Sequence, residues 1–414
     1  MTTRRAFFKD SAIAMFGVGA LPAWLSRSVY AAGLGRARRK KILVAIFQRG
    51  AVDGLNVVVP FGEKRYYDLR PSIAIPPPDG SANSAIDLEG FFGLHPSLAA
   101  LKPLFDAHEL AIVDAVGSPD PTRSHFDAQD YMESGTPGFK ATSDGWMNRA
   151  LPPESGKVSP LRAVSLGAAL PRALRGRNEA IAVSSLNDFQ IHDSRTAATF
   201  ESMYDHSRDS MLHGTGAETF SAVKMLESVQ KQSYAPANGA SYPGGRFGQS
   251  LKQIARLIKA DVGLEVAFAD IGGWDTHVNE VGQQPALGQL ANNLRDFSQS
   301  LAAFYQDMGD RMEDVVVVTM SEFGRTAREN GDRGTDHGHA NVMFAMGGGV
   351  RGGKVYGDWP GLSDEQLYEG RDLNLTTDFR DVLGELVSRH LGNTNLKAVF
   401  PGYDAAKFRG LIAG

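Results

Sequence analysis

The chain of 414 residues contains no cysteine. This absence excludes a thiol nucleophile, a disulfide framework and any zinc or iron–sulfur site with cysteine ligands. The motifs Gly-x-Ser-x-Gly and His-Glu-x-x-His and the Walker phosphate loop are also missing. The sequence therefore does not indicate the serine hydrolases, zinc proteases or nucleotide hydrolases that these motifs mark.

The chain also lacks an excess of positive charge. Its formal net charge is −4 at pH 7, so it offers no general electrostatic attraction to nucleic acid. The short basic cluster at residues 36–41 directly precedes an apolar run, and we expect it to be a solvated flank of that run. Nucleic acid is therefore not an expected partner.

The first 32 residues have the features of an export signal. Residues 4–9 ("RRAFFK") precede a short apolar run at 11–25, and Ala31 and Ala32 provide small residues for cleavage. This order resembles a twin-arginine signal peptide. The run is short and is interrupted by Pro22, and no other stretch approaches the length of a membrane span. We expect a periplasmic or extracellular protein, exported by the twin-arginine pathway, with no stable membrane span after signal removal.

Apolar runs and helical patterns alternate along the rest of the chain. Five apolar runs bounded by turn residues predict strands buried on both faces, at 41–47, 110–116, 263–272, 314–320 and 341–349. Helical patterns between strands indicate crossover connections and a parallel sheet. We therefore expect one α/β domain over residues 40–414, in which residues 187–245, rich in Ser, Ala and Gly, form an insertion or cap.

Two helices are predicted from apolar residues at steps of three and four. The longer helix is marked by Leu287, Leu290, Leu294, Phe297, Leu301, Phe304, Met308 and Met312, and the shorter by Phe247, Leu251, Ile254 and Ile258.

Polar side chains follow the predicted strands at each point where a strand ends. They are Arg49 and Asp53; Arg123, Ser124, His125 and Asp127; Asp275, His277 and Glu280; Ser321, Glu322 and Arg325; and, in the loop "GTDHGHA" before the last strand, Asp336, His337 and His339. In an open parallel sheet, loops at the carboxyl ends of the strands meet at one crevice, where ligands bind. Asp and His are ligands for zinc or a harder divalent ion. The pattern predicts one site built from five loop segments.

Each of these residues also has a structural alternative when it is taken alone. The alternatives are Asp53 as a turn residue before Gly54, His125 as a buried imidazole, Asp275-Thr276 as a helix cap, Glu322 as an ion-pair partner of Arg325, and His337 and His339 as solvated loop residues. The agreement between the segments favours a site, and we expect the other histidines to be structural or exposed.

The same segments resemble a known family. The twin-arginine start, "RGAVDGLN", "SHFDAQDYMESG", "GGWDTHVN", "SEFGRT" and "GTDHGHAN…GGGVRGGKVYG" are together similar to the family called domain of unknown function 1501, over essentially the whole chain. That family is similar to the alkaline phosphatase and sulfatase superfamily. The resemblance implies a three-layer α/β sandwich with a mainly parallel central sheet and a two-metal site at the strand ends.

The resemblance also implies roles for individual residues. It makes Asp53, Asp275, His277, Glu322 and one of His337 and His339 metal ligands, supported by Asp336, and it makes Ser124 the nucleophile beside Arg123, His125 and Arg325. Either arginine would hold a phosphate or sulfate group. Phe323 stands where the superfamily carries a His and cannot replace it as a ligand, so we expect one ion instead of two, or a site without metal, as alternatives to the two-metal site. The ion would be zinc, manganese, magnesium or calcium.

Two functions follow as expectations. The first is an exported metal-dependent hydrolase of phosphate or sulfate esters, acting on a small anionic ester or a surface polymer. Sulfatase chemistry that starts from Cys or Ser in a Cys/Ser-x-Pro-x-Arg motif is disfavoured because the motif is missing. The alternative is a catalytically inactive exported binding or scaffold protein on the same fold, which the Phe323 departure favours.

Overall fold

A nine-stranded sheet organises the chain in a computed structural model that describes residues 39–153, 158–186, 210–405 and 407–413. The predicted signal at 1–32 and the first part of the predicted insertion, 187–209, lie outside the described residues. Residues from Lys41 onward form one compact unit. Among the described residues, no helix is both long and apolar enough to cross a membrane.

The strands lie in the order β11-β5-β10-β9-β1-β8-β6-β7, and β12 pairs with β5. Their bounds are β1 Ile42–Gln48, β5 Leu110–Gly117, β6 Ala163–Ser165, β7 Ile181–Ala182, β8 Val266–Ile271, β9 Val315–Met320, β10 Asn341–Gly347, β11 Val355–Tyr356 and β12 Thr377–Asp378. All pairs are parallel except those of β10 with β5 and β9. The predicted mainly parallel sheet is confirmed, and each of the five predicted strands is present.

Strand β1 lies at the centre because both of its faces are apolar. Its Ala45 lies opposite Phe268 of β8 on one side and Val318 of β9 on the other. Alternate side chains enter two separate cores, with Val44 in one and Ala45 in the other, since successive residues of a strand point to opposite faces. Burial on both faces explains why the run has no polar alternation.

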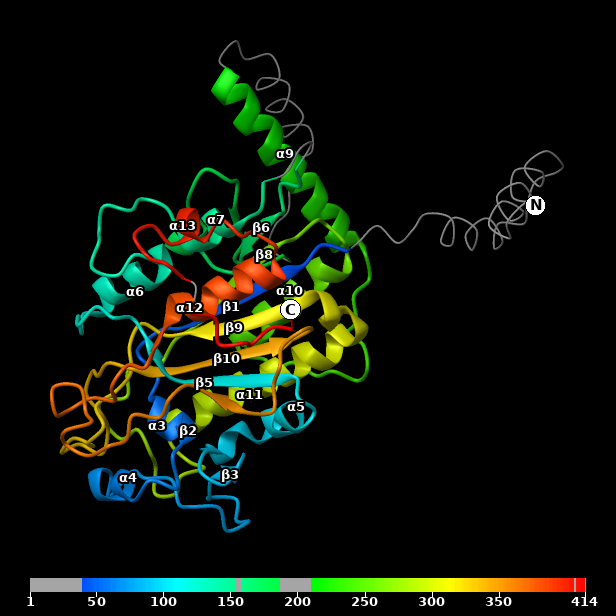
Figure 1. The fold of residues 1–414 in the computed structure, drawn as a ribbon. Helices are drawn as coiled ribbons and strands as arrows, with labels where there is room; N and C mark the ends of the chain where they lie inside the picture. Colours follow the sequence, from blue (N-terminus) through cyan, green and yellow to red (C-terminus); the bar gives the residue numbers. More distant parts are fainter. Residues whose placement is uncertain (1–38, 154–157, 187–209, 406, 414) are drawn as a thin grey trace, which may run out of the picture. The chain divides into compact units, whose positions relative to one another are not determined.

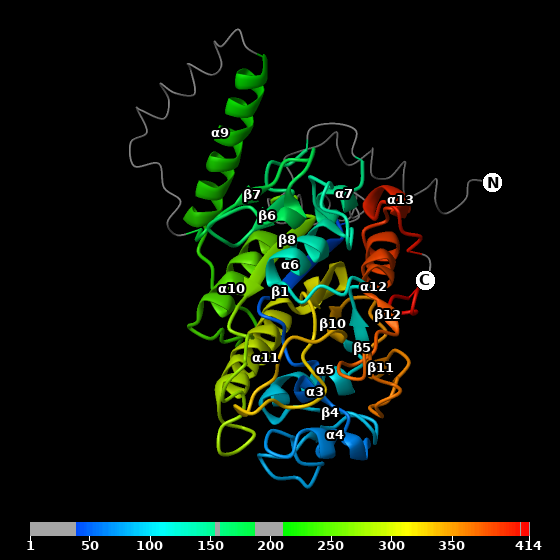
Figure 2. The same cartoon turned by 90° about the vertical axis from the view of Figure 1, so that its left-hand side faces the viewer.

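Helices cover both faces of this sheet (Figures 1 and 2). On one face lie α10 (Arg246–Lys259) and α11 (Gln289–Met308), which pack in the same core as Val44. On the other face lie α12 (Phe379–Glu385), its π-helical continuation Leu386–His390, α7 (Trp146–Ala150) and α13 (Leu396–Val399). This arrangement confirms the three-layer α/β sandwich.

The long helix is shorter than its apolar pattern predicts. Helix α11 begins at Gln289 because Gly288, with φ of 109°, precedes it, and Leu287 is 52% exposed outside it. It ends before Gly309, and Met312 lies in a separate 3₁₀ helix, Gly309–Asp314. The pattern of α10 is confirmed, since all four of its predicted apolar residues are buried.

The remaining elements are short, apart from α9 (Ser210–Lys231) in the predicted insertion. A small antiparallel sheet joins β2 (Val58–Val59), β4 (Gly93–Leu94) and β3 (Ile86–Asp87). The helices are α3 (Gly54–Val57), α4 (Lys64–Leu69), α5 (Lys102–Asp106) and α6 (His125–Ser134), with 3₁₀ helices at Pro96–Leu101 and Arg172–Leu174.

The direction of β10 explains why the polar loops meet. Strands β1, β5, β8 and β9 run the same way, so the loops after them lie at one edge of the sheet. Because β10 runs in the opposite direction, it is the loop before it, residues 334–340, that lies at this edge. The segment "GTDHGHA" therefore joins the other loops by preceding an antiparallel strand.

A buried histidine makes the stability of this fold depend on pH. His390 Nε2 donates to Ile42 O at 2.9 Å, and burial lowers the pKa of His390 to about 4. This value lies below the pKa of about 6.5 of a histidine in an unfolded chain. The contribution of neutral His390 to the free energy of unfolding is therefore complete above pH 6.5 and is lost as the pH falls towards 4.

We expect the free energy of unfolding of His390→Gln to fall by about 2 kcal/mol less than that of the wild type between pH 7 and 4.5. Urea unfolding at both pH values measures the two changes. The exposed His108, replaced by Gln, is the control; equal losses in all three proteins would contradict the prediction.

Candidate functional site

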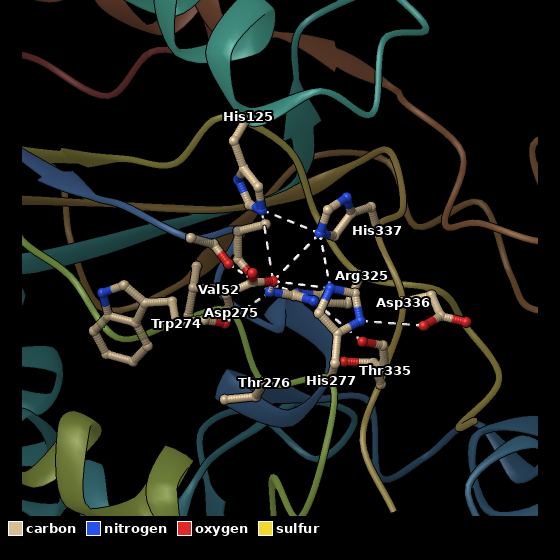
Figure 3. A network of polar contacts seen from close by, with 12 residues as sticks. Val52, His125, Trp274, Asp275, Thr276, His277, Arg325, Thr335, Asp336 and His337 are labelled. Carbon is tan, nitrogen blue, oxygen red and sulfur yellow. Dashed lines mark hydrogen bonds and ion pairs between the residues drawn. The ribbon is translucent and has the colours of Figure 1, made fainter. Parts of the chain in front are cut away.

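Four side chains converge at the carboxyl edge of the sheet, and we call them the His–Asp cluster: His125, Asp275, His277 and His337 (Figure 3). His125 is the first residue of α6, Asp275 and His277 follow β8, and His337 precedes β10. Asp275 Oδ1 lies 3.0 Å from Nε2 of His277, 3.3 Å from Nε2 of His337 and 3.5 Å from Nε2 of His125. His337 Nε2 lies 2.9 Å from His277 Nε2 and 3.1 Å from His125 Nε2.

The three imidazoles are held at their other nitrogen by oxygen atoms. His125 Nδ1 is 2.7 Å from Glu322 Oε1, and His277 Nδ1 is 3.2 Å from Asp336 Oδ1. His337 Nδ1 is 2.9 Å from the carbonyl oxygen of Arg123. Carbonyl and carboxylate oxygens only accept hydrogen bonds, so Nδ1 is the donor in each ring.

A neutral imidazole that donates from Nδ1 carries a lone pair on Nε2. The lone pair of His337 therefore lies 2.9 Å from that of His277 and 3.1 Å from that of His125, and Asp275 Oδ1 lies 3.0–3.5 Å from all three Nε2 atoms. Without a proton or cation between them these contacts are repulsive. Donor atoms of His125, Asp275 and His337 lie within 4.8 Å of one another, which suits a metal ion, and His277 lies beside them.

The charge states of the cluster follow from its surroundings. The hydrogen bond with Glu322 raises the pKa of His125 despite partial burial, whereas burial lowers the pKa of His337. Burial alone would raise the pKa of Asp275, but the hydrogen bond and charge of Arg325 hold it below its usual value. Asp275 is therefore an anion at neutral pH, as a metal ligand must be.

Arg325 joins the loops that carry the cluster. Its guanidinium is fully buried and binds Asp275 Oδ1 at 2.6 Å. The same group donates to the carbonyl oxygens of Gly50, Ala51, Trp274 and Thr335, at 2.5–3.1 Å. These donors are committed to the protein, so in this arrangement Arg325 positions Asp275, and its role as a holder of substrate stays a prediction.

Glu322 lies next to the cluster with both carboxylate oxygens occupied. Oε1 accepts from Gly50 N at 2.8 Å, from Gln129 Nε2 at 2.9 Å and from His125, and Oε2 accepts from Ser321 Oγ at 3.1 Å. Burial would raise its pKa, but these hydrogen bonds, led by that of His125, lower it. Glu322 thus holds the ring of His125, and Arg325 pairs with Asp275 in place of the Glu322–Arg325 pair considered above.

Phe323 packs against two imidazole rings of the cluster. The ring is buried, and its centroid lies 5.0 Å from those of His125 and His337. At the position where the resemblance implies a further histidine, this side chain therefore supports two imidazoles by contact.

Asp53 is held in a buried ion pair with Arg70. Its oxygens accept from Arg70 Nη1 at 2.5 Å and Nη2 at 2.9 Å. Burial alone would raise the pKa of Asp53, but the charge and hydrogen bonds of Arg70 outweigh this effect, so that the pKa lies below its usual value. Burial and the neighbouring Asp53 raise the pKa of Glu280, which also bonds Thr276 and Thr335. The metal-ligand role of Asp53 therefore stays a prediction.

The other predicted residues surround the cluster. Ser124 is exposed at the start of α6, and its hydroxyl does not cap the helix. Arg123 pairs with Asp372 and Glu369 at 2.6 and 2.8 Å. His339 is buried and stacks on Tyr368, with ring centroids 4.2 Å apart, and so lies outside the set of converging nitrogens.

Two contributors were missed by the reasoning from sequence. Gln129 binds both Glu322 and Arg49, and its spacing of four residues from His125 on a helix could have indicated it. Arg70 lies 17 residues after Asp53, and no periodic pattern links the two. The Asp275-Thr276 cap is not formed, since the next described helix begins only at Gln289.

Residues 107–399 match the family described as "Protein of unknown function (DUF1501)". This match confirms the family that the motifs indicate, while the twin-arginine start and "RGAVDGLN" at 49–56 lie outside the matched residues. A comparison with curated proteins finds no match.

Three solved structures are similar to the chain. The lipoteichoic acid synthase LtaP from Listeria monocytogenes has a TM-score of 0.40 and 11% identity, over 89% of this chain and 76% of that chain. The PsFucS1 sulfatase from Pseudoalteromonas sp. has a TM-score of 0.36 and 13% identity, over 94% and 78%. The C-terminal periplasmic domain of EcEptC from Escherichia coli, in complex with Zn, has a TM-score of 0.33 and 10% identity, over 76% and 74%.

We expect Arg325→Ala to lower the free energy of unfolding by about 3–5 kcal/mol, because it leaves the buried carbonyls of Ala51, Trp274 and Thr335 without their donor, at about 1–3 kcal/mol each. The free energy of unfolding of Arg325→Lys should lie between those of the wild type and Arg325→Ala, since lysine keeps the charge but lacks the planar guanidinium. Urea unfolding measures both changes. The control is Arg328→Ala, at an exposed position of the same loop, with an expected change within about 0.5 kcal/mol. A loss for Arg325→Ala no larger than that of the control would contradict the role assigned to Arg325.

Proposed function

This chain belongs to the DUF1501 family of proteins of unknown function, and we propose that it is a hydrolase of phosphate or sulfate esters that uses one divalent metal ion. The observation that carries the proposal is the convergence of three Nε2 atoms and one carboxylate oxygen in the His–Asp cluster. A hydrogen bond from the other ring nitrogen to a carboxylate or carbonyl oxygen, as each imidazole of the cluster has, is typical of metal-binding histidines.

The ligands in this proposal are His125, Asp275, His277 and His337. Three imidazoles and one carboxylate favour zinc, or manganese, over magnesium and calcium, which prefer sites made of oxygen atoms. When bound, such an ion lowers the pKa of water or a hydroxyl group and neutralises charge on an oxyanion. The protein supplies the orientation of the ligands through Glu322 and the other oxygens at Nδ1.

We propose one ion and not two because the other predicted ligands have other partners. Both oxygens of Asp53 bind Arg70, and both oxygens of Glu322 accept hydrogen bonds. Phe323 fills the apolar side of the cluster and offers no donor atom. A second ion would require these side chains to exchange partners.

Ser124 is the proposed nucleophile. It precedes His125 directly, its side chain is exposed, and its hydroxyl is not used to cap α6. The backbone N–H groups of the first turn of α6 favour an anionic group near this residue. Attack of Oγ on phosphorus or sulfur would form a seryl ester and release the alcohol of the substrate, and water would then cleave the seryl ester.

The second candidate is an exported protein that binds its ligand without turnover. Phe323 supports it, since an aromatic ring replaces a potential ligand.

Export through the twin-arginine pathway belongs to both candidates and rests on residues 4–9. Fractionation of cells that carry Arg4→Lys and Arg5→Lys tests it: loss of the exported form is expected, and unchanged export would contradict it.

The metal proposal predicts different results for the two histidines of one loop. His337→Ala should lose most of the bound metal and most of the difference in Tm with and without chelator, because an ion that binds only the folded state stabilises it. His339→Ala is the matched control and should keep the metal, since its ring stacks on Tyr368. Elemental analysis and thermal unfolding measure both. Equal metal content in His337→Ala and the wild type would refute the proposed ligand set.

Ester hydrolysis distinguishes the two candidate functions. A panel of chromogenic phosphate monoesters, phosphate diesters and sulfate esters should reveal turnover that requires the metal. Ser124→Ala should lower kcat at least 100-fold while it keeps the metal, because it removes the attacking oxygen alone. Ser233→Ala, at an exposed position after α9, is the control and should retain activity. Full metal occupancy without turnover of any ester in the wild type would favour the binding protein.

A further inference from the structure

A groove of about 590 Å³ lies along α6, and we call it the α6 groove. Its wall includes Arg49, Phe126, Arg172, Arg175, Arg246 and Asp270. This volume lies in the range of pockets that hold small organic ligands and exceeds the space that a single phosphate or sulfate ion needs.

The α6 groove and the His–Asp cluster share the same supports. His125 of the cluster and Phe126 of the groove are consecutive residues of α6. Gln129, which also lines the groove, donates to Glu322 at 2.9 Å and accepts from Arg49 at 2.8 Å. Glu322 in turn holds His125. A ligand in the groove therefore lies beside the proposed metal site, on the same edge of the sheet.

Two of the four arginines in the groove are already neutralised. Arg49 binds Glu133 at 2.8 Å and Asp270 at 3.0 Å. Arg172 pairs with Asp130 and donates to the carbonyl oxygen of Thr142. These pairs form the wall of the groove and leave little charge for a ligand.

The other two arginines also line the groove, and their charges are less fully paired. The side chain of Arg246 is 71% exposed, and its ion pair with Asp270 is long, with Nη2 3.6 Å from Oδ1, beyond hydrogen-bond length. Arg175 is exposed and donates from Nε to Leu170 O at 3.2 Å; within the described part of the chain, no carboxylate pairs with it. Two guanidinium groups with free donors are suited to an oxyanion such as sulfate or phosphate.

Phe126 adds an apolar surface to this charged groove. Its side chain is 89% exposed although it lies on the first turn of a helix. Because Phe126 lines the groove, its ring gives a ligand in the groove an apolar face to pack on. The flat ring fits the C–H face of a sugar, whose hydroxyl groups the polar wall of the groove can bind.

We propose that the α6 groove binds a sugar that carries a sulfate or phosphate group, with the anion between Arg175 and Arg246 and the sugar ring against Phe126. This proposal rests on the proposed ester hydrolysis and names its substrate class: an anionic oligosaccharide or polysaccharide. The sugar in the groove is a neighbour of the sugar whose ester is cleaved, and its anion is not the reacting group.

Binding to protein freed of metal by a chelator tests the groove separately from catalysis. The probes are cellotetraose that carries sulfate on a terminal sugar, unmodified cellotetraose and inorganic sulfate, each followed by isothermal titration calorimetry. We expect the sulfated tetrasaccharide to bind at least tenfold more tightly than either of the others. Arg175→Ala/Arg246→Ala should weaken its binding at least tenfold, and Phe126→Ala should weaken binding of both tetrasaccharides.

The controls are Arg177→Ala and Lys252→Ala, which remove positive charge outside the groove and should bind like the wild type. Equal binding by the double arginine variant and the wild type would overturn the proposal. Inorganic sulfate that binds as tightly as the sulfated tetrasaccharide would overturn the sugar component. Because no metal or turnover is involved, loss of the proposed function in the ester assay would leave these results readable by themselves.

Discussion

The buried guanidinium of Arg325 is the interaction on which the candidate site depends. It binds carbonyl oxygens from the loops after β1 and β8 and before β10, and it binds the carboxylate of Asp275. A sheet brings loop ends to one edge, but it does not fix their heights or angles. A planar group with five donors can connect three loops at once and leave no buried carbonyl unpaired. The cost of burying its charge is offset by Asp275, so the support of the loops and the ionisation of a proposed ligand are one interaction.

The orientation of the imidazoles follows from a second set of contacts. Oxygen atoms of Glu322, Asp336 and the Arg123 backbone hold the Nδ1 atoms, and Phe323 limits how far two of the rings can turn. Each ring is therefore directed before any ligand arrives. Such preorganisation lowers the free-energy cost of forming a site. The groups that face one another are all electron donors, an arrangement that suits the proposed cation.

The sequence predicts the sheet and most of the cluster because both depend on local pattern. Apolar runs mark the strands, and polar residues directly after them mark the edge where His125, Asp275 and His277 meet. The partners of buried charges cannot be predicted in this way. Asp53 pairs with Arg70, and Arg325 pairs with Asp275, because the fold brings their loops close together in space. The antiparallel direction of β10 is likewise set by pairing with its neighbours, and an apolar run carries no information about it.

In the proposed site, one ion binds among three imidazoles and one carboxylate. X-ray absorption at the metal edge of zinc-loaded protein tests this claim most directly, because it reports the number and type of ligand atoms around the ion. We expect one ion per chain with about three imidazole nitrogens and one oxygen from the protein, at zinc–nitrogen distances of about 2.0–2.1 Å. A shell made only of oxygen atoms, or two ions at a short metal–metal distance, would contradict it.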